Sequence, residues 1–129
     1  MKKQQPPDYF DVAISKNTAA KTRANDFYVR VYEVVAQVPE GKVTTYGAIA
    51  EFLGSKGSSR MVGYAMGAVP EDMGIHPHRV INRIGALSAA HKFGGYKRMR
   101  YLLEREGITF KGEKVDMDKH FWKPKKNKT

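Results

Sequence analysis

The segment Gly74-Ile75-His76-Pro77-His78-Arg79-Val80-Ile81-Asn82 places two imidazoles and a guanidinium close together in the chain. A histidine side chain can form covalent intermediates, so His76 and His78 are the candidates for nucleophilic chemistry. The chain has no cysteine, which excludes thiolate nucleophiles, disulfides and thiolate metal sites. We find no pair of carboxylates placed for hydrolysis and no phosphate-binding glycine loop. These residues favour a binding protein over an enzyme.

Metal ligation is the other chemistry that histidines could supply. The four histidines of the chain are His76, His78, His91 and His120. No two of them are four residues apart, the spacing that would put two ligands on one helix face, and there is no sulfur ligand to join them. The sequence therefore predicts neither a metal site nor a cofactor.

The distribution of charge points to a polyanionic partner. The net charge is +10, and the middle of the chain, residues 54–100, has eight basic residues against two acidic ones. Residues 119–129 add five lysines and no acid. A basic patch with lysine-rich arms favours nucleic acid, because phosphate contacts release counterions. The alternative is a soluble domain with solvated tails.

The length is that of one domain. We expect a basic, partly flexible N-terminal extension over residues 1–24, a folded domain over 25–118 and a lysine-rich tail over 119–129. Four apolar residues of the extension could pack as a short strand: Tyr9, Phe10, Val12 and Ile14. The chain after Pro124 is expected to be disordered.

Two absences set the expected location. No apolar run approaches the ~20 residues that a membrane span needs. The start of the chain lacks the apolar stretch of a signal peptide. We expect a cytoplasmic monomer without a membrane partner.

The elements that position the histidine segment are predicted to be mostly helical. Asn25 or Asp26 could cap a helix with apolar residues from Phe27 to Val38, which Pro39 and Gly41 would end. After an extended piece over 42–44, Thr44 or Thr45 would cap a second helix over 46–53. Following a turn over 54–57, Ser58 or Ser59 would cap a third helix over 60–69, closed by Pro70. Two short helices joined by a glycine-containing turn are typical of a helix-turn-helix.

The rest of the domain is predicted to combine extended structure with one more helix. Residues 78–87 are expected to be extended, turning at Gly85. Gly94-Gly95 would break the chain before a last helix over 96–106, stopped by Gly107. Ile108 to Phe110 and Val115 suggest a terminal hairpin. The predicted fold class is mainly α with short β, a winged helix-turn-helix.

The third helix is unusual in keeping two glycines, Gly63 and Gly67, each of which costs ~1 kcal/mol relative to alanine. Close approach to another backbone would compensate for that cost. The other backbone could be the wall of a DNA groove or a neighbouring helix of the same protein. Arg60, at the start of this helix, could contact phosphate or enter DNA.

Five stretches, in order and at normal spacing, resemble the DNA-binding C-terminal domain of the O6-alkylguanine-DNA alkyltransferases. They are Val31 to Ala50, Ser59 to Met66, His78 to Asn82, Gly94 to Arg98 and Leu102 to Gly107. The family's separate N-terminal domain is not in this sequence. The family's active-site pattern is Pro-Cys-His-Arg-Val, and alignment on His78-Arg79-Val80 puts Pro77 at the cysteine. A single domain without that nucleophile resembles the alkyltransferase-like branch of the family.

The resemblance implies a role for each matching residue. Arg60 matches an arginine that fills the gap left by a flipped nucleotide, and Tyr46 matches a tyrosine that turns the 3′ phosphate outward. Small residues (Gly63, Ala65 and Gly67) would let the third helix enter the minor groove. The implied DNA-binding residues are Tyr46, Ser59, Arg60, Gly63, Tyr64, Gly67 and Arg79. The implied lesion pocket consists of Tyr46, His76, Pro77, Asn82, Ala89 and Lys92.

His78 and Glu106 match the histidine and glutamate that activate the cysteine of the enzymes, so here they would form a vestigial network with a structural role. The resemblance therefore implies that this chain has no catalytic residue. His76-Pro77 departs from both branches of the family, and Val69 replaces an asparagine that supports the hinge before the active site.

The implied function is non-catalytic recognition of O6-alkylguanine in duplex DNA by nucleotide flipping, with signalling to nucleotide excision repair proteins. The alternative is a general DNA-binding or transcription-regulating domain without lesion preference. A catalyst of alkyl transfer is the third and weakest interpretation.

Overall fold

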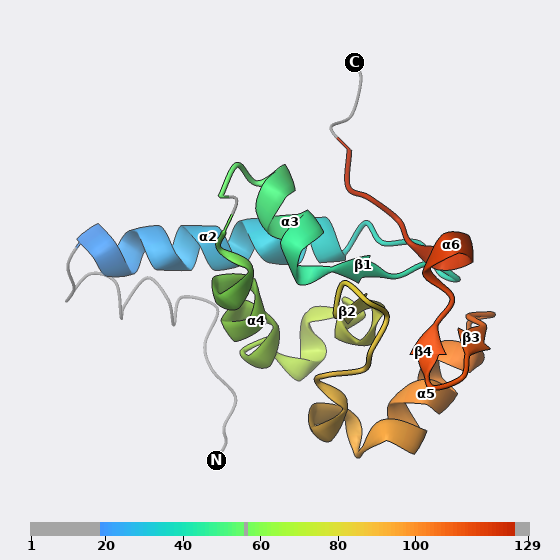
Figure 1. Ribbon diagram of the computed structural model, residues 1–129. Coiled ribbons are helices and arrows are strands. Elements are labelled where there is room, and N and C mark those ends of the chain that lie inside the picture. The colour runs from blue at the N-terminus through green and yellow to red at the C-terminus, as the bar shows by residue number, and fades with distance from the viewer. Residues whose placement is uncertain (1–18, 56, 126–129) are drawn as a thin grey trace, which may run out of the picture.

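The computed structural model describes residues 19–55 and 57–125 (Figure 1). The strand predicted around Tyr9 to Ile14, Lys56 of the basic patch and the last four residues lie outside this range. The described part is mainly helical, with two pairs of two-residue strands. No described helix is long and apolar enough to cross a membrane.

The first described helix, α2, runs from Ala19 to Val35 and so passes through the caps predicted at Asn25 and Asp26. That predicted start is wrong because the preceding residues include alanine, lysine and arginine, which favour helix and offer no break. The helix also ends three residues before Val38. The chain leaves it through tight turns, in which the Val38 amide donates to the Val35 carbonyl at 3.1 Å.

Helix α3 spans Tyr46–Phe52 and begins where the sequence predicts. Thr45 is its N-cap, and the Thr45 side chain accepts a hydrogen bond from the Ala48 amide at 3.0 Å. Capping by threonine satisfies an amide that has no partner within the first turn. Ile49 and Ala50 are buried, which fixes the face that α3 presents to α2 and α4.

Helix α4 spans Ser59–Gly67, and Ser58 occupies its N-cap position without a side-chain hydrogen bond to the helix. It packs against both α2 and α3, and these three helices share one hydrophobic cluster. The Tyr32 hydroxyl donates to the Ala65 carbonyl at 2.8 Å inside this cluster. The arrangement is the predicted helix-turn-helix, with α2 as its support (Figure 1).

After α4 the chain forms two short 3-10 helices, η1 (Glu71–Met73) and η2 (Pro77–Arg79). The prediction of extended structure from His78 onward is therefore wrong over its first two residues. Pro77 stands in the first turn of η2, where its fixed φ favours a helical start and its missing amide costs nothing.

Strand β2 (Val80–Ile81) pairs in parallel with β1 (Thr44–Thr45). The pairing places the end of η2 beside the start of α3, two points far apart in the sequence. Gly85 then turns the chain at a φ of 90°, and a side chain there would meet the Val115 carbonyl at 2.7 Å. Only glycine fits that turn.

The C-terminal half contains η3 (Ala90–Phe93), α5 (Tyr96–Glu104) and an antiparallel pair, β3 (Phe110–Lys111) with β4 (Lys114–Val115). The hairpin is confirmed, and α5 ends two residues before its predicted end. Gly107 adopts a φ of 93° after α5, as predicted for a stop residue. Met99 and Leu103 of α5 lie in a second hydrophobic cluster with Ile81 and Val115.

A further short helix, α6 (Met117–His120), was not predicted, so the tail boundary at residue 119 falls inside an element. His120 is buried, and its ring bonds the Gly41 carbonyl at 3.0 Å and the Thr109 amide at 3.0 Å. Beyond α6, the Trp122 amide donates to the Val43 carbonyl at 2.7 Å. These contacts hold residues 117–122 against the chain that leads into β1.

Candidate nucleic-acid interface

The predicted DNA-contacting residues of α4 form one exposed face of that helix. Ser59, Arg60, Tyr64 and Gly67 are exposed, and Gly63 is half-buried among them. Residues three and four apart share a helix face. Val62 and Ala65 are fully buried on the other side. The helix therefore presents the predicted stripe to solvent and its apolar side to α2 and α3.

The space around Gly63 tests the two explanations for the glycines of α4, which were a neighbouring helix of the protein or a DNA groove. A β-carbon added at Gly63 would meet no atom within 4 Å, so packing inside the protein does not require glycine there. The explanation by a close internal helix fails at this position, and close approach by an external partner remains. Ala65 behaves differently, because it is buried in the core and cannot line a groove.

Gly67 brings the end of α4 against η3. A β-carbon at Gly67 would lie 2.5 Å from the Lys92 amine, so the Lys92 side chain reaches across the last turn of α4. Lys92 as a whole is exposed to solvent. The structure thus joins a predicted pocket residue to the predicted DNA-binding stripe.

Tyr46 begins α3 and is half-buried. Burial raises the pKa of its phenol above the ordinary 10.0, against the opposing effect of a hydrogen bond with the Ser88 side chain. The phenol is therefore neutral at physiological pH, so no charge on it would repel a phosphate.

The segment around Pro77 forms a wall of rings. The His76 and His78 rings lie edge to face with centroids 5.8 Å apart, and the His78 and Phe93 rings do the same at 6.4 Å. His76 is exposed, whereas Pro77 and His78 are half-buried. η2 and η3 therefore meet at His78 and Phe93.

Glu106 is bound on both oxygens. The Arg79 guanidinium donates to the two Glu106 oxygens at 2.8 and 2.9 Å, and its third nitrogen donates to the Val38 carbonyl at 2.8 Å. His78 Nε2 lies 3.0 Å from Glu106 Oε2. The predicted pair of His78 and Glu106 is present, but Arg79 is its third member.

Arg79 is consequently removed from the predicted DNA contacts. It is 7% exposed, and its guanidinium is held by Glu106 and Val38 rather than turned to solvent. The family resemblance had implied a DNA contact at this position. Glu106 is 27 residues away in the sequence, and only the fold brings its carboxylate to Arg79.

The charges of this network follow from its geometry. Burial raises the pKa of the Glu106 carboxyl, but hydrogen bonds from Arg79 and His78 outweigh it and hold that pKa below the ordinary 4.5. Burial also lowers the pKa of His78 below 6.5, more than its bond to Glu106 raises it. A neutral His78 donates its Nε2 proton to an ionised Glu106, which suits a structural pair.

The remaining predicted pocket residues occupy different parts of the loop region. Asn82 Oδ1 accepts from the Ile84 amide at 2.7 Å, so its carbonyl shapes the turn at Gly85. Its amide group carries the remaining donors. Ala89 is half-buried at the start of η3. The structure therefore gives Asn82 a local role that the sequence did not indicate.

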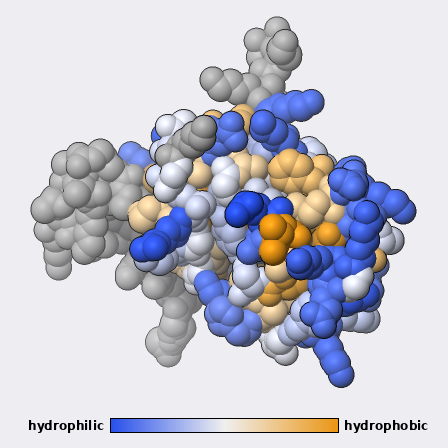
Figure 2. All heavy atoms as spheres, in the orientation of Figure 1, coloured by the Kyte–Doolittle hydropathy of each residue, from blue (hydrophilic) through white to orange (hydrophobic). Residues whose placement is uncertain are grey.

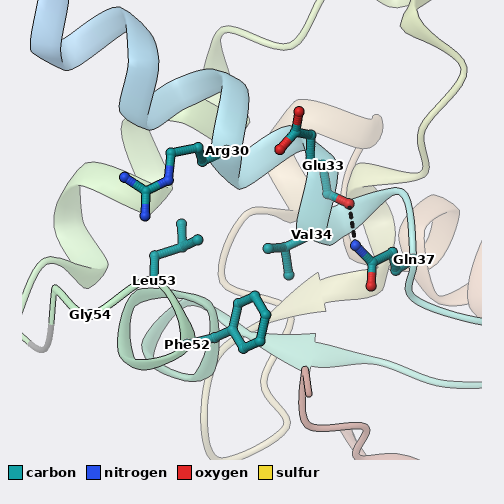
Figure 3. A pocket seen from close by; sticks show the side chains of 7 residues that line it. All are labelled: Arg30, Glu33, Val34, Gln37, Phe52, Leu53 and Gly54. Carbon is teal, nitrogen blue, oxygen red and sulfur yellow. Dashed lines mark hydrogen bonds between the residues drawn. The ribbon is translucent and has the colours of Figure 1, made fainter. Parts of the chain in front are cut away.

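A separate hollow of about 400 Å³ was missed by the sequence analysis (Figure 3). It lies between α2 and the end of α3, with Phe52 and Leu53 facing Val34 and with Arg30 and Glu33 at its edge. Its other lining residues are Gln37 and Gly54. None of them belongs to the predicted lesion pocket, so the hollow is a different feature of the surface.

The chain matches a known family of DNA-binding domains. Residues 26–108 match the family model described as 6-O-methylguanine DNA methyltransferase, DNA binding domain. That range contains α3, α4, the Pro77 segment and Glu106.

Similar proteins are also found along almost the whole of their own length. Alkyltransferase-like protein 1 of Schizosaccharomyces pombe is 38% identical over 107 residues, which is 79% of this chain and 99% of that protein. A DNA base-flipping protein of Escherichia coli is 34% identical over 117 residues, 90% of this chain and 88% of that protein. The crystal structure of S. pombe Atl1 with damaged DNA containing O6-carboxymethylguanine superposes with a TM-score of 0.66 at 34% identity. It covers 78% of this chain and 97% of that one.

Proposed function

The chain belongs to the family of 6-O-methylguanine DNA methyltransferase DNA-binding domains, and we propose that it recognises O6-alkylguanine in duplex DNA without repairing it. Recognition would proceed by minor-groove binding and by flipping of the damaged nucleotide. Similar proteins named for alkyltransferase likeness and for base flipping support this assignment.

One observation carries the proposal: α4 presents the predicted DNA-binding stripe to solvent in a chain that has no cysteine to accept an alkyl group. We place Pro77 at the position of the nucleophile, in the first turn of η2. Proline has neither a nucleophilic side chain nor an amide hydrogen. The His78 and Glu106 pair beside it is bound by Arg79 and therefore serves as a structural tie.

The placement of Arg60 and Tyr46 supports the roles that we propose for them. Arg60 is exposed in the first turn of α4 and can enter the base stack when α4 lies in the groove. Tyr46, neutral and half-buried at the start of α3, can press on a phosphate. Flipping a base costs a few kcal/mol, which an inserted arginine and a phosphate contact would offset. The pocket for the flipped base would lie by Pro77, His76, Ala89 and Lys92.

The same proposal includes the downstream steps predicted from the sequence. A protein that binds a lesion without removing it needs a repair system to act after it, and we propose nucleotide excision repair proteins as that partner. We further propose that the protein is a monomer of the cytoplasm. Fluorescent labelling of the chain and sedimentation of the purified protein would test these two points.

The decisive experiment is a fluorescence anisotropy titration at fixed salt. It compares one duplex carrying a single O6-methylguanine with the same duplex carrying guanine. We expect the wild type to bind the lesion more tightly and Arg60→Ala to lose that preference, because the substitution removes the group that fills the vacated stack. Arg30→Ala removes an exposed arginine from α2 instead and is expected to keep the preference.

Equal affinity of the wild type for the two duplexes would contradict the proposal. It would leave a general DNA-binding or transcription-regulating domain on the same scaffold. Alkyl label found on the protein, or released from the DNA during incubation, would contradict the non-catalytic part.

A further inference from the structure

Two exposed arginines flank a tyrosine on α5 and at its C-cap, and none of the three belongs to the stripe of α4. The Arg98 guanidinium carbon lies 5.6 Å from the centroid of the Tyr101 ring, and that of Arg105 lies 5.8 Å away. These distances allow cation–π attraction, which orders both guanidinium groups. Tyr101 is 50% exposed, so the ring holds the arginines at the surface.

The charge of this face is not balanced by its neighbours. Lys97, Arg98 and Arg105 are exposed, and among the described residues none of them forms an ion pair. Glu104 is the acid on the same helix, and it is bound to Arg100 at 3.0 Å. Figure 2 shows hydrophilic side chains projecting at the lower right of the view, over the part of the molecule where Figure 1 places α5.

Arg100, on the same helix, differs because its guanidinium is bound within the protein. Its guanidinium stacks over the Phe110 ring at 4.2 Å and donates to the Tyr96 hydroxyl and the Gly112 carbonyl at 3.0 and 2.9 Å. Arg98 and Arg105 have no such protein acceptors among the described hydrogen bonds. The fold therefore uses Arg100 to hold the hairpin and leaves the donors of Arg98 and Arg105 available.

The α5 face is connected to the α4 stripe through η3. Lys92 reaches over Gly67 at the end of α4, and a β-carbon at Gly94 would lie 3.3 Å from the Arg98 side chain. η3 packs directly on α5. Lys92 therefore lies at the end of α4, and Arg98 lies beside Gly94, which directly follows η3.

From this arrangement we propose that Lys97, Arg98, Tyr101 and Arg105 form a second DNA contact, which binds the sugar-phosphate backbone independently of the lesion. Guanidinium groups bind phosphate oxygens through paired donors, and a stacked arginine loses little conformational entropy when it does so. This inference rests on the proposed function, because α4 must first bind the duplex before these residues can reach its backbone. It adds that the footprint extends beyond the flipped nucleotide.

Salt dependence tests this contact, because each phosphate contact contributes about 0.9 to the slope of log affinity against log salt. The variant is the double substitution Arg98→Gln with Arg105→Gln, at exposed positions outside the core. We expect affinity to fall by the same factor, roughly three- to tenfold, for duplexes with guanine and with O6-methylguanine. The slope should decrease by about one to two, and the lesion preference should be unchanged.

The matched control removes the same two charges elsewhere, with Arg30→Gln on α2 and Lys119→Gln on α6, both exposed. The control is expected to lower affinity and slope much less. Equal losses in both variants would overturn the proposal, because they would show an effect of net charge alone. Unchanged DNA binding together with lost binding of a polyglutamate peptide would also overturn it and assign the face to an acidic protein.

The outcomes separate this contact from the proposed function. If the wild type shows no lesion preference while the α5 variant still flattens the slope, only the proposed function fails. If the preference holds and the α5 variant matches its control, only the second contact fails.

Discussion

At the scale of single residues, Glu106 is the best example of a role decided by its neighbours. In this protein it neutralises a buried arginine. Its side chain is 15% exposed, and Arg79 occupies both of its oxygens. Removing one partner of such a pair leaves the other charge buried and uncompensated. The stability of the protein should depend on this carboxylate even though its chemistry does not.

We therefore expect Glu106→Gln to lower the free energy of unfolding by about 2–4 kcal/mol at pH 7. Because the folded-state pKa of Glu106 lies below 4.5, the ionised carboxylate stabilises the fold above that pH. This stabilisation is lost as the pH falls through the folded-state pKa. Urea unfolding of wild type and variant from pH 7 to pH 3 should show the difference shrinking only below about pH 4.5.

Glu104→Gln is the control, since its side chain is 48% exposed and its pair with Arg100 lies at the surface. That substitution should change stability by no more than about 0.5 kcal/mol. A similar small effect for Glu106→Gln would show that the buried network contributes nothing to the fold.

At the scale of elements, α4 contains a glycine that lowers helix stability and that packing within the protein does not explain. Gly63 has room for a side chain, and glycine within a helix is less favourable than alanine. A helix that is selected to lie against DNA would keep glycine there, since an added methyl group would hold the backbone away from the groove.

Gly63→Ala should consequently move stability and binding in opposite directions. The free energy of unfolding should rise by about 0.5–1 kcal/mol, because alanine restricts the unfolded chain and favours the helix. Affinity for the O6-methylguanine duplex should fall. Urea unfolding and anisotropy titration of the same preparation measure the two effects.

A rise in stability with unchanged affinity would remove Gly63 from the interface. A fall in stability would instead show that the side chain meets a protein atom, against the open space that the structure shows around this position.

At the scale of the whole molecule, the tail and the domain are not separate at residue 119. The structure holds α6 and Trp122 against the chain before β1, and Pro124 is buried. A deletion of 119–129 would remove buried His120 together with the lysines. Its effect on DNA binding would therefore combine a loss of stability with a loss of charge. The cut that isolates the charge lies after Pro124.

Truncation after Pro124 removes Lys125, Lys126 and Lys128. If these lysines contact phosphate, the slope of log affinity against log salt should decrease by about one to two. Replacing the same three lysines with arginine keeps their charge and should keep the slope. A slope unchanged by the truncation would limit the tail to a role in solubility.

The sequence by itself determined the mainly helical class, a threonine cap at position 44 or 45, the helix-turn-helix and the stop at Gly107. These features depend on near neighbours in the chain: capping side chains, glycine turns and helical periodicity. The resemblance in five ordered stretches likewise needed only the order of residues. The family model confirms it over 26–108.

Only the tertiary structure decided the roles of Arg79, Gly63 and α6. Arg79 reads as a DNA contact until Glu106 is brought to it from 27 residues away. From the sequence, Gly63 could lie against a neighbouring helix or against DNA, and only the space around it separates these two explanations. α6 is too short to be predicted from local preference and forms because His120 joins Gly41 to Thr109. For Arg79 and α6 the deciding interactions join distant segments, and for Gly63 the deciding observation is that no other segment approaches it. No local pattern in the sequence records which segments will meet.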